Sequence, residues 1–164
     1  MSKILIVFYS HSGNTRKIAE CIQQNTQGDL FEIEPVSDYP TSYNTVVEQA
    51  KKEIQRGFRP EIKAMPEGFE SYDTVFVGSP IWWHTMAPPI ATFLAGAEWS
   101  GKTVVPFSTH GGGGAGRMEA DVATLCGGAD CKPGLVVSGS GGGKLAQQVA
   151  EWVRTIGLDA KESK

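Results

Sequence analysis

The sequence predicts an α/β protein with a doubly wound, five-stranded parallel sheet that is covered by helices on both faces. Short apolar runs rich in β-branched and aromatic residues alternate along the whole chain with segments of helical periodicity. Continuous apolar strands of this kind are typical of parallel sheets whose two faces are both buried. Capping and glycine-rich loops follow three of the apolar runs, as expected where helices begin.

Each strand of this prediction is followed by a helix. Because residues 29–36 alternate apolar with acidic side chains, they read as a half-exposed edge strand. Residues 58–72, which include Pro60, Pro66 and Gly68, indicate an irregular connection. No linker or internal repeat divides the chain, so we expect a single domain over residues 1–164. The expected strands are residues 3–9, 29–36, 73–79, 102–108 and 135–139, and the expected helices lie near residues 18–22, 44–56, 90–95, 117–125 and 146–156.

Composition excludes several classes of protein. Charged residues make up 20% of the chain and the net charge is -3, which argues against a basic surface for nucleic acid. The longest apolar stretch is far below the roughly 18 residues that span a bilayer, and the N-terminus shows no secretory signal. Three cysteines without a C-x-x-C pair predict a reducing, cytoplasmic setting, with each thiol buried or half-buried.

Three loops have an unusual composition and should meet at one edge of the sheet. They are residues 10–15, 80–89 and 109–116, which contain no Asp or Glu but all three His of the chain and two of its four Trp. In doubly wound sheets, ligands bind outside the carboxyl ends of the strands. These loops therefore predict a ligand-binding site.

The first loop is rich in neutral hydrogen-bond donors. Ser10, Ser12 and Thr15 supply hydroxyl groups, and Asn14 supplies an amide, at the start of a predicted helix. Gly13 permits a positive φ that turns successive N–H groups inward. Such a helix start favours an anion such as phosphate. The alternative is simple capping of the helix by Ser12 or Asn14.

The second loop contains the adjacent pair Trp82 and Trp83 between prolines. A flat aromatic ligand could stack on one of these rings, and the alternative is that the rings belong to the core or to an interface. Neighbours in an extended loop point apart, which disfavours a core position for both.

The third loop has four consecutive glycines, residues 111–114, which would let a ligand approach the backbone closely. Gly111, Gly113 and Gly116 also match G-x-G-x-x-G, but the acidic residue expected about 20 positions later is missing. Residues 139–144 likewise lack the spacing of a P-loop. The three His lack a Cys or carboxylate partner within the loops, so we predict hydrogen bonds to a ligand or to solvent and no metal site.

Taken together, these loops resemble those of the flavodoxin family. Residues 10–15 resemble the family's FMN-phosphate loop, and residues 78–83 and 109–112 resemble its two other flavin loops. The resemblance covers the whole chain and implies a short-chain member with strand order 2-1-3-4-5 and non-covalently bound FMN. The residues that it places at FMN are Ser10, His11, Ser12, Gly13, Asn14, Thr15, Pro80, Ile81, Trp82, Trp83, His84, Thr109, His110, Gly111 and Gly112.

Two departures from the family pattern bear on redox chemistry. The loops lack the carboxylates common around the flavin of electron carriers, and Arg16 and Arg117 lie nearby. A positive surrounding would make the potential of the reduced flavin less negative. In addition, His84 stands where the family often has a glycine whose peptide turns over on reduction. Because a non-glycine residue resists positive φ, His84 implies two-electron chemistry.

The leading functional hypothesis is an FMN protein that carries electrons between larger redox partners, with no catalytic residue of its own. The alternative is an enzyme, an FMN or quinone reductase that uses a nicotinamide donor. A third hypothesis is a flavin-free binding module on the same fold. No nucleic-acid or membrane partner is expected, and the oligomeric state is left open.

Overall fold

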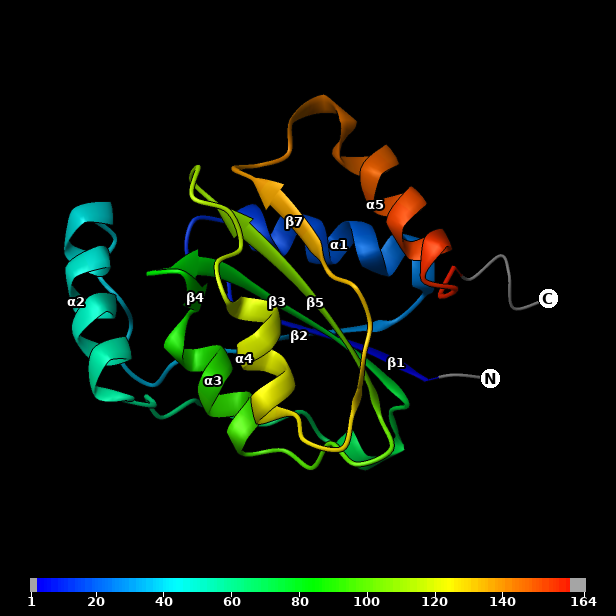
Figure 1. The fold of residues 1–164 in the computed structure, drawn as a ribbon, viewed down its shortest axis with the longest axis horizontal. Helices are drawn as coiled ribbons and strands as arrows, with labels where there is room; N and C mark the ends of the chain where they lie inside the picture. Colours follow the sequence, from blue (N-terminus) through cyan, green and yellow to red (C-terminus); the bar gives the residue numbers. More distant parts are fainter. Residues whose placement is uncertain (1–2, 160–164) are drawn as a thin grey trace.

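Five parallel strands form the central sheet of the computed structural model, which describes residues 3–159 (Figure 1). The order is β2-β1-β3-β5, and both β6 and β7 pair with β5 at the far edge. This is the predicted order 2-1-3-4-5, with the fifth strand in two pieces. The strands are β1 (Ile4–Phe8), β2 (Asp29–Glu32), β3 (Thr74–Trp82), β4 (Thr85–Met86), β5 (Thr103–His110), β6 (Asp130–Cys131) and β7 (Leu135–Ser138).

Helices follow the strands as the periodicity predicts, and they cover both faces. Helices α1 and α5 lie on one face, and α3 and α4 on the other, with α2 beyond them (Figure 1). Apolar side chains fill the two layers between sheet and helices, so the sheet is buried on both sides. The helices are α1 (Asn14–Thr26), α2 (Tyr43–Arg56), α3 (Pro88–Ala95), α4 (Met118–Leu125) and α5 (Leu145–Thr155), with short 3-10 turns at Phe69–Ser71 and Gly142–Lys144.

Two strands differ from the sequence prediction. Strand β2 ends at Glu32, and Pro35 forms only an isolated antiparallel bridge with Ile62, because proline has no N–H to donate to a ladder. Strand β3 instead continues to Trp82 and then turns back into the two-residue strand β4. The prediction of an extended loop at residues 80–89 is therefore wrong, because the first half of this segment forms a β-hairpin.

The cysteines are only partly as expected. Cys126 is buried, and burial raises the pKa of its thiol to about 12. Cys21 is half-buried, whereas Cys131 is exposed, contrary to the expectation for all three. Both residues of the short edge strand β6 are exposed, Cys131 among them. Between residues 3 and 159, none of the helices is both long enough and apolar enough to span a bilayer.

Candidate functional site

The three predicted loops meet at the carboxyl edge of the sheet. The hydroxyl oxygens of Thr15 and Thr109 lie 3.0 Å apart, which joins the first loop to the third. The backbone N–H of Arg117 donates to the carbonyl of His84 at 2.7 Å, which joins the third loop to the second. These contacts link segments far apart in the sequence, because parallel strands bring their carboxyl ends to one edge.

The first loop presents its donors around the start of α1. The Ser10 hydroxyl oxygen accepts hydrogen bonds from the N–H groups of Gly13 and Arg16, at 3.1 and 3.2 Å. Gly13 has φ 98°, as its position in the sequence suggested. Gly13 occupies the N-cap position of this helix, and Ser10, rather than Ser12 or Asn14, accepts the N–H of Arg16 in its first turn. An oxygen held by two N–H groups at a helix start is the arrangement that a phosphate oxygen would also satisfy.

The second loop is a hairpin with a two-residue turn. Trp82 pairs with Thr85, and Trp83 and His84 form the turn with φ 51° and 69°. Positive φ at both central positions is usually met by Asn-Gly, and each non-glycine residue there costs roughly 1–3 kcal/mol. His84 therefore adopts positive φ despite the resistance expected of a non-glycine residue, because its surroundings impose this conformation.

Gly116 allows the turn to dock on the third loop. A Cβ atom on Gly116 would lie 2.2 Å from the His84 carbonyl oxygen, and Gly116 has φ 57°. The N–H of Arg117, the next residue, donates to this same carbonyl. The turn is therefore held by a close backbone contact that only glycine permits.

The two adjacent tryptophans have different surroundings. Trp82 is only 7% exposed and meets the rings of Tyr9, Tyr39 and His11 edge to face. Trp83 is half-buried, and its indole N–H donates to the Val47 carbonyl on α2 at 2.7 Å. Trp82 therefore belongs to the core, while Trp83 stays partly exposed beside the turn, with the Lys51 ammonium 4.8 Å from the centre of its ring.

A cavity of about 320 Å³ lies beside this turn. Its size is in the range of small-molecule sites. The third loop borders it and curls around His110, whose Nδ1 accepts the N–H groups of Gly112 and Gly114 at 3.0 and 3.1 Å. Ideal Cβ atoms on residues 111–114 would meet nothing within 4 Å. The cavity is lined by Tyr43, Val47, Ile81, Trp82, Trp83, His84, His110, Gly111, Gly113 and Gly114.

A second cleft, of about 460 Å³, adjoins the first loop. Ser10, His11 and Ser12 line it, and the His11 Nε2 hydrogen-bonds the Pro40 carbonyl at 2.8 Å. Tyr43 borders both this cleft and the cavity and is 70% exposed. Sequence reasoning missed Tyr43, although it shares a helix face with Val47 one turn later.

The charge around the site differs from the sequence expectation. Glu32, Glu34 and Asp38 line the second cleft, since the chain after β2 runs past the first loop. Arg16 is paired with Glu32. Just after the third loop, the Nε atom of Arg117 lies 3.0 Å from a carboxylate oxygen of Asp121. Both arginines are thus paired, so the inference of a positive surrounding and a less negative potential loses its basis.

A buried carboxylate, that of Glu53, bonds one of the tyrosines that pack against Trp82. Glu53 is 6% exposed and accepts hydrogen bonds from the hydroxyl of Tyr39 at 2.5 Å and the amide of Gln49 at 2.9 Å. Burial, first, and then the hydrogen bond to Glu53 raise the pKa of Tyr39 well above its usual range. Burial likewise raises the pKa of Tyr9. Both phenols stay protonated at neutral pH and pack against Trp82.

The predicted residues fall into two groups. Nine of them line the cavity or the second cleft, and the other six lie in the same loops. In the part of the chain that the structure describes, no three His, Cys, Asp or Glu side chains gather closely enough to hold a metal. The first group is Ser10, His11, Ser12, Ile81, Trp82, Trp83, His84, His110 and Gly111, and the second is Gly13, Asn14, Thr15, Pro80, Thr109 and Gly112.

The strand order defines a doubly wound α/β protein, and the three loops form a candidate ligand site at the carboxyl edge of its sheet. The family model described as flavodoxin matches residues 3–156, and the chain belongs to the flavodoxin family. A comparison with curated proteins found no match.

Solved structures agree with this membership. One similar structure is that of a protein from Bacteroides eggerthii that is described as a flavoprotein. It has 30% sequence identity to this chain and a TM-score of 0.83, and the match covers 97% of this chain and 100% of that one. A flavoprotein from Lactobacillus acidophilus in complex with FMN has 25% identity and a TM-score of 0.71, covering 83% of this chain and 93% of that one. Family membership and this complex both support FMN as the cofactor, as the sequence predicted.

Proposed function

We propose that the protein binds one FMN at the three-loop site and transfers electrons through it. One observation carries the proposal: the capped start of α1 and the aromatic cavity lie at the same sheet edge, joined by the Thr15–Thr109 contact. A phosphate and a flat ring system require this combination of donors and open aromatic surface.

Different loops would bind different parts of FMN. The N–H groups of Gly13 and Arg16 now bond the Ser10 hydroxyl, and they would donate to the phosphate instead. Trp83 would offer its ring to the isoalloxazine, and the glycines beside His110 would leave room for the ring edge. When bound, FMN supplies one- and two-electron chemistry, while the protein supplies orientation and electrostatics.

The second candidate function is a reductase that takes hydride from a nicotinamide donor. The docked turn favours it, because the His84 carbonyl is already held by the Arg117 N–H and Gly116 packs on it. A turn held in this way resists a change of peptide orientation between redox states.

The partners of the carrier would be redox proteins, and the exposed Tyr43 marks the open side of the site.

A visible spectrum tests the cofactor and separates the functions. The protein is mixed with FMN, freed of unbound flavin and titrated anaerobically with dithionite, and a second sample receives NADH or NADPH. Retained flavin that the nicotinamides do not bleach indicates the carrier, and rapid bleaching indicates the reductase. A colourless protein after FMN addition would contradict both and leave the flavin-free binding module.

The phosphate role of the first loop is tested by comparing FMN with riboflavin. We expect the Ser10 hydroxyl to donate to the phosphate once the two N–H groups have turned to it, so Ser10→Ala should weaken FMN binding about tenfold, the effect of one charge-assisted hydrogen bond. Riboflavin has no phosphate, so its dissociation constant should stay unchanged. Ser100→Ala, an exposed serine in another loop, is the control. Equal losses for FMN and riboflavin would contradict a phosphate site at Ser10.

A further inference from the structure

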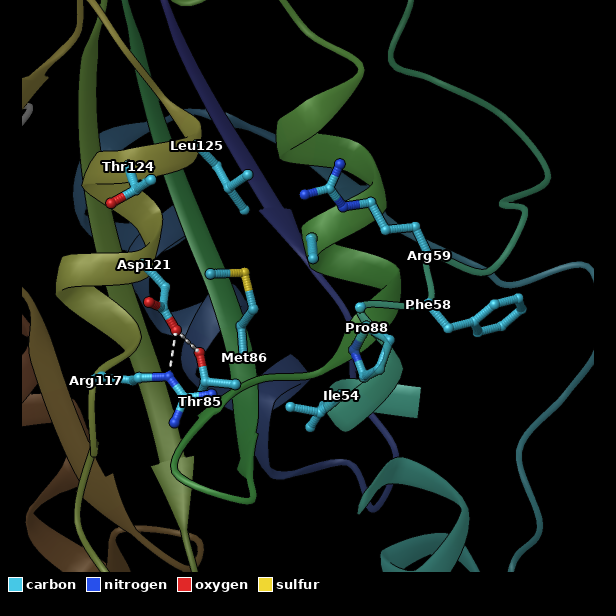
Figure 2. A pocket seen from close by; sticks show the side chains of 12 residues that line it. Ile54, Phe58, Arg59, Thr85, Met86, Pro88, Arg117, Asp121, Thr124 and Leu125 are labelled. Atoms are coloured by element: carbon cyan, nitrogen blue, oxygen red, sulfur yellow. Dashed lines mark hydrogen bonds and ion pairs between the residues drawn. The ribbon is translucent and has the colours of Figure 1, made fainter. Parts of the chain in front are cut away.

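A third cleft, of about 260 Å³, borders strand β4 of the hairpin and shares no lining residue with the FMN cavity. It is formed by the end of α2, the strand β4 and the helices α3 and α4 (Figure 2). None of the residues predicted at FMN lines it. The cleft is therefore distinct from the proposed flavin site.

The floor of this cleft is apolar. Met86 is 3% exposed, and Pro88, Ala91 and Leu125 lie around it. Ile54 adds a further aliphatic surface from α2. Small-molecule sites are typically lined in this way, with a few polar groups that fix the orientation of the ligand.

The charged groups of the cleft leave one cation uncompensated. Asp121 accepts a hydrogen bond from Thr85 at 2.5 Å and pairs with Arg117 at 3.0 Å. Arg59 has no hydrogen-bond or ion-pair partner within residues 3–159. With two arginines and one aspartate, the lining carries a net charge of +1 (2 − 1).

The side chains lie so that this cation faces the apolar floor. In Figure 2, Arg59 approaches from one side of the cleft, and Arg117, Asp121 and Thr85 form a bonded group on the other. Met86 lies between them. An occupant could therefore place an apolar ring on Met86 and a negative group at Arg59, with the geometry that guanidinium offers a carboxylate.

We propose that this cleft is a binding site for a small aromatic carboxylate. Its volume of about 260 Å³ lies just below the roughly 300–1,000 Å³ of drug-sized ligand sites, which suits one ring and not a nucleotide. An occupant would touch Thr85 and Met86, which pair with Trp82 and Ile81 of the FMN cavity. The proposal does not rest on FMN binding.

Benzoate is the probe for the test, and benzyl alcohol is its uncharged counterpart. Protein with 13C-labelled methionine methyl groups is titrated by NMR in the absence of FMN. The Met86 methyl signal should shift and saturate, while Met65, which lines a different cleft, should not move. Benzyl alcohol should bind at least about fivefold more weakly, because it cannot pair with Arg59.

Two variants locate the probe. Arg59→Gln should weaken benzoate about fivefold or more, and Ala91→Leu, which fills the cleft, should abolish the saturable shift. Arg154→Gln, on an exposed face of α5, should leave binding unchanged. Thermal unfolding checks that each variant is folded. Absence of a saturable Met86 shift in the unmodified protein, or benzoate binding that survives both cleft variants, would overturn the proposal.

Discussion

The hairpin at residues 81–86 and the glycine loop at residues 111–114 border the same cavity, but they are built in opposite ways. The hairpin has bulky residues where glycine is usual, and its turn is held by a backbone contact with Gly116 and Arg117. The glycine loop has no side chains, and its Cβ positions face open space. The first region is shaped by the protein, whereas the second leaves space that a ligand could fill.

The largest effect should follow from Gly116→Ala, which disrupts the contact that holds the hairpin turn on the third loop. The new methyl group would collide with the His84 carbonyl and force the turn off the third loop. We expect a loss of about 2–4 kcal/mol in the free energy of unfolding and more than tenfold weaker FMN binding. Urea unfolding and flavin fluorescence titration measure the two quantities.

Gly101→Ala is the matched control for this variant. Gly101 has φ 81°, but a Cβ there would meet nothing within 4 Å. It should show only the cost of positive φ, with FMN binding unchanged. If the two variants lose equal stability, the contact between Gly116 and His84 does not hold the turn.

Gly113→Ala tests the open region. A Cβ there meets no protein atom within 4 Å, and Gly113 is absent from the residues with positive φ. The free energy of unfolding should stay equal or rise by up to about 1 kcal/mol. FMN binding should weaken about tenfold, because the methyl group would take space that the ring edge needs.

Gly127→Ala is its control, since that position is equally open and lies outside the cavity. It should leave FMN binding unchanged. Unaltered FMN affinity in Gly113→Ala would show that the flavin does not approach this loop.

His84→Gly should remove strain from the turn. Glycine adopts the observed φ without a steric penalty, so we expect a gain of about 1 kcal/mol in the free energy of unfolding. Gln27→Gly, at φ 61° on the end of α1, should gain a similar amount without affecting flavin. A loss of stability in His84→Gly, measured by urea unfolding, would mean that the imidazole makes a compensating contact.

The smallest effect is a loss in the free energy of unfolding at alkaline pH, and it comes from Tyr39, whose ring packs against Trp82 of the hairpin. The pKa of Tyr39 is raised above its unfolded value near 10, so the folded protein keeps a proton that the unfolded chain loses. Its contribution is complete below pH 10 and declines as the pH rises. We expect a loss of roughly 0.8 kcal/mol at pH 10.5 from this group.

Urea unfolding at pH 9 and pH 10.5 measures this decline. Tyr39→Phe should reduce the difference between the two pH values, whereas Tyr43→Phe, on an exposed side chain, should not. An unchanged pH dependence in Tyr39→Phe would show that Tyr9 and other groups account for it.

Much of the molecule could be predicted from local patterns. Apolar runs such as residues 3–9 and 102–108 are too short and too β-branched for helices, and their alternation with helical periodicity leads to the parallel sheet. The meeting of three loops also follows, because parallel strands direct their carboxyl ends to one edge. Nine of the fifteen residues predicted in those loops line the cavity or the second cleft.

Other features depend on contacts between distant residues. The turn at Trp83–His84 has no local signal, since neither residue favours positive φ, and it exists because Gly116 and Arg117 meet His84 across the fold. Likewise, only packing decides that Trp82 is buried and Trp83 is not. Glu32 neutralises Arg16 only because separate segments converge, whereas Asp121 lies one helical turn after Arg117.

The sequence by itself determined the order of elements, the class of fold and the edge of the sheet where the three loops of the candidate site meet. The tertiary structure alone decided the shape of the hairpin, the position of each tryptophan and the charge around the site. The physical reason is range: backbone preference and periodicity act over a few neighbouring residues, whereas strain, burial and ion pairing depend on residues that only folding brings together.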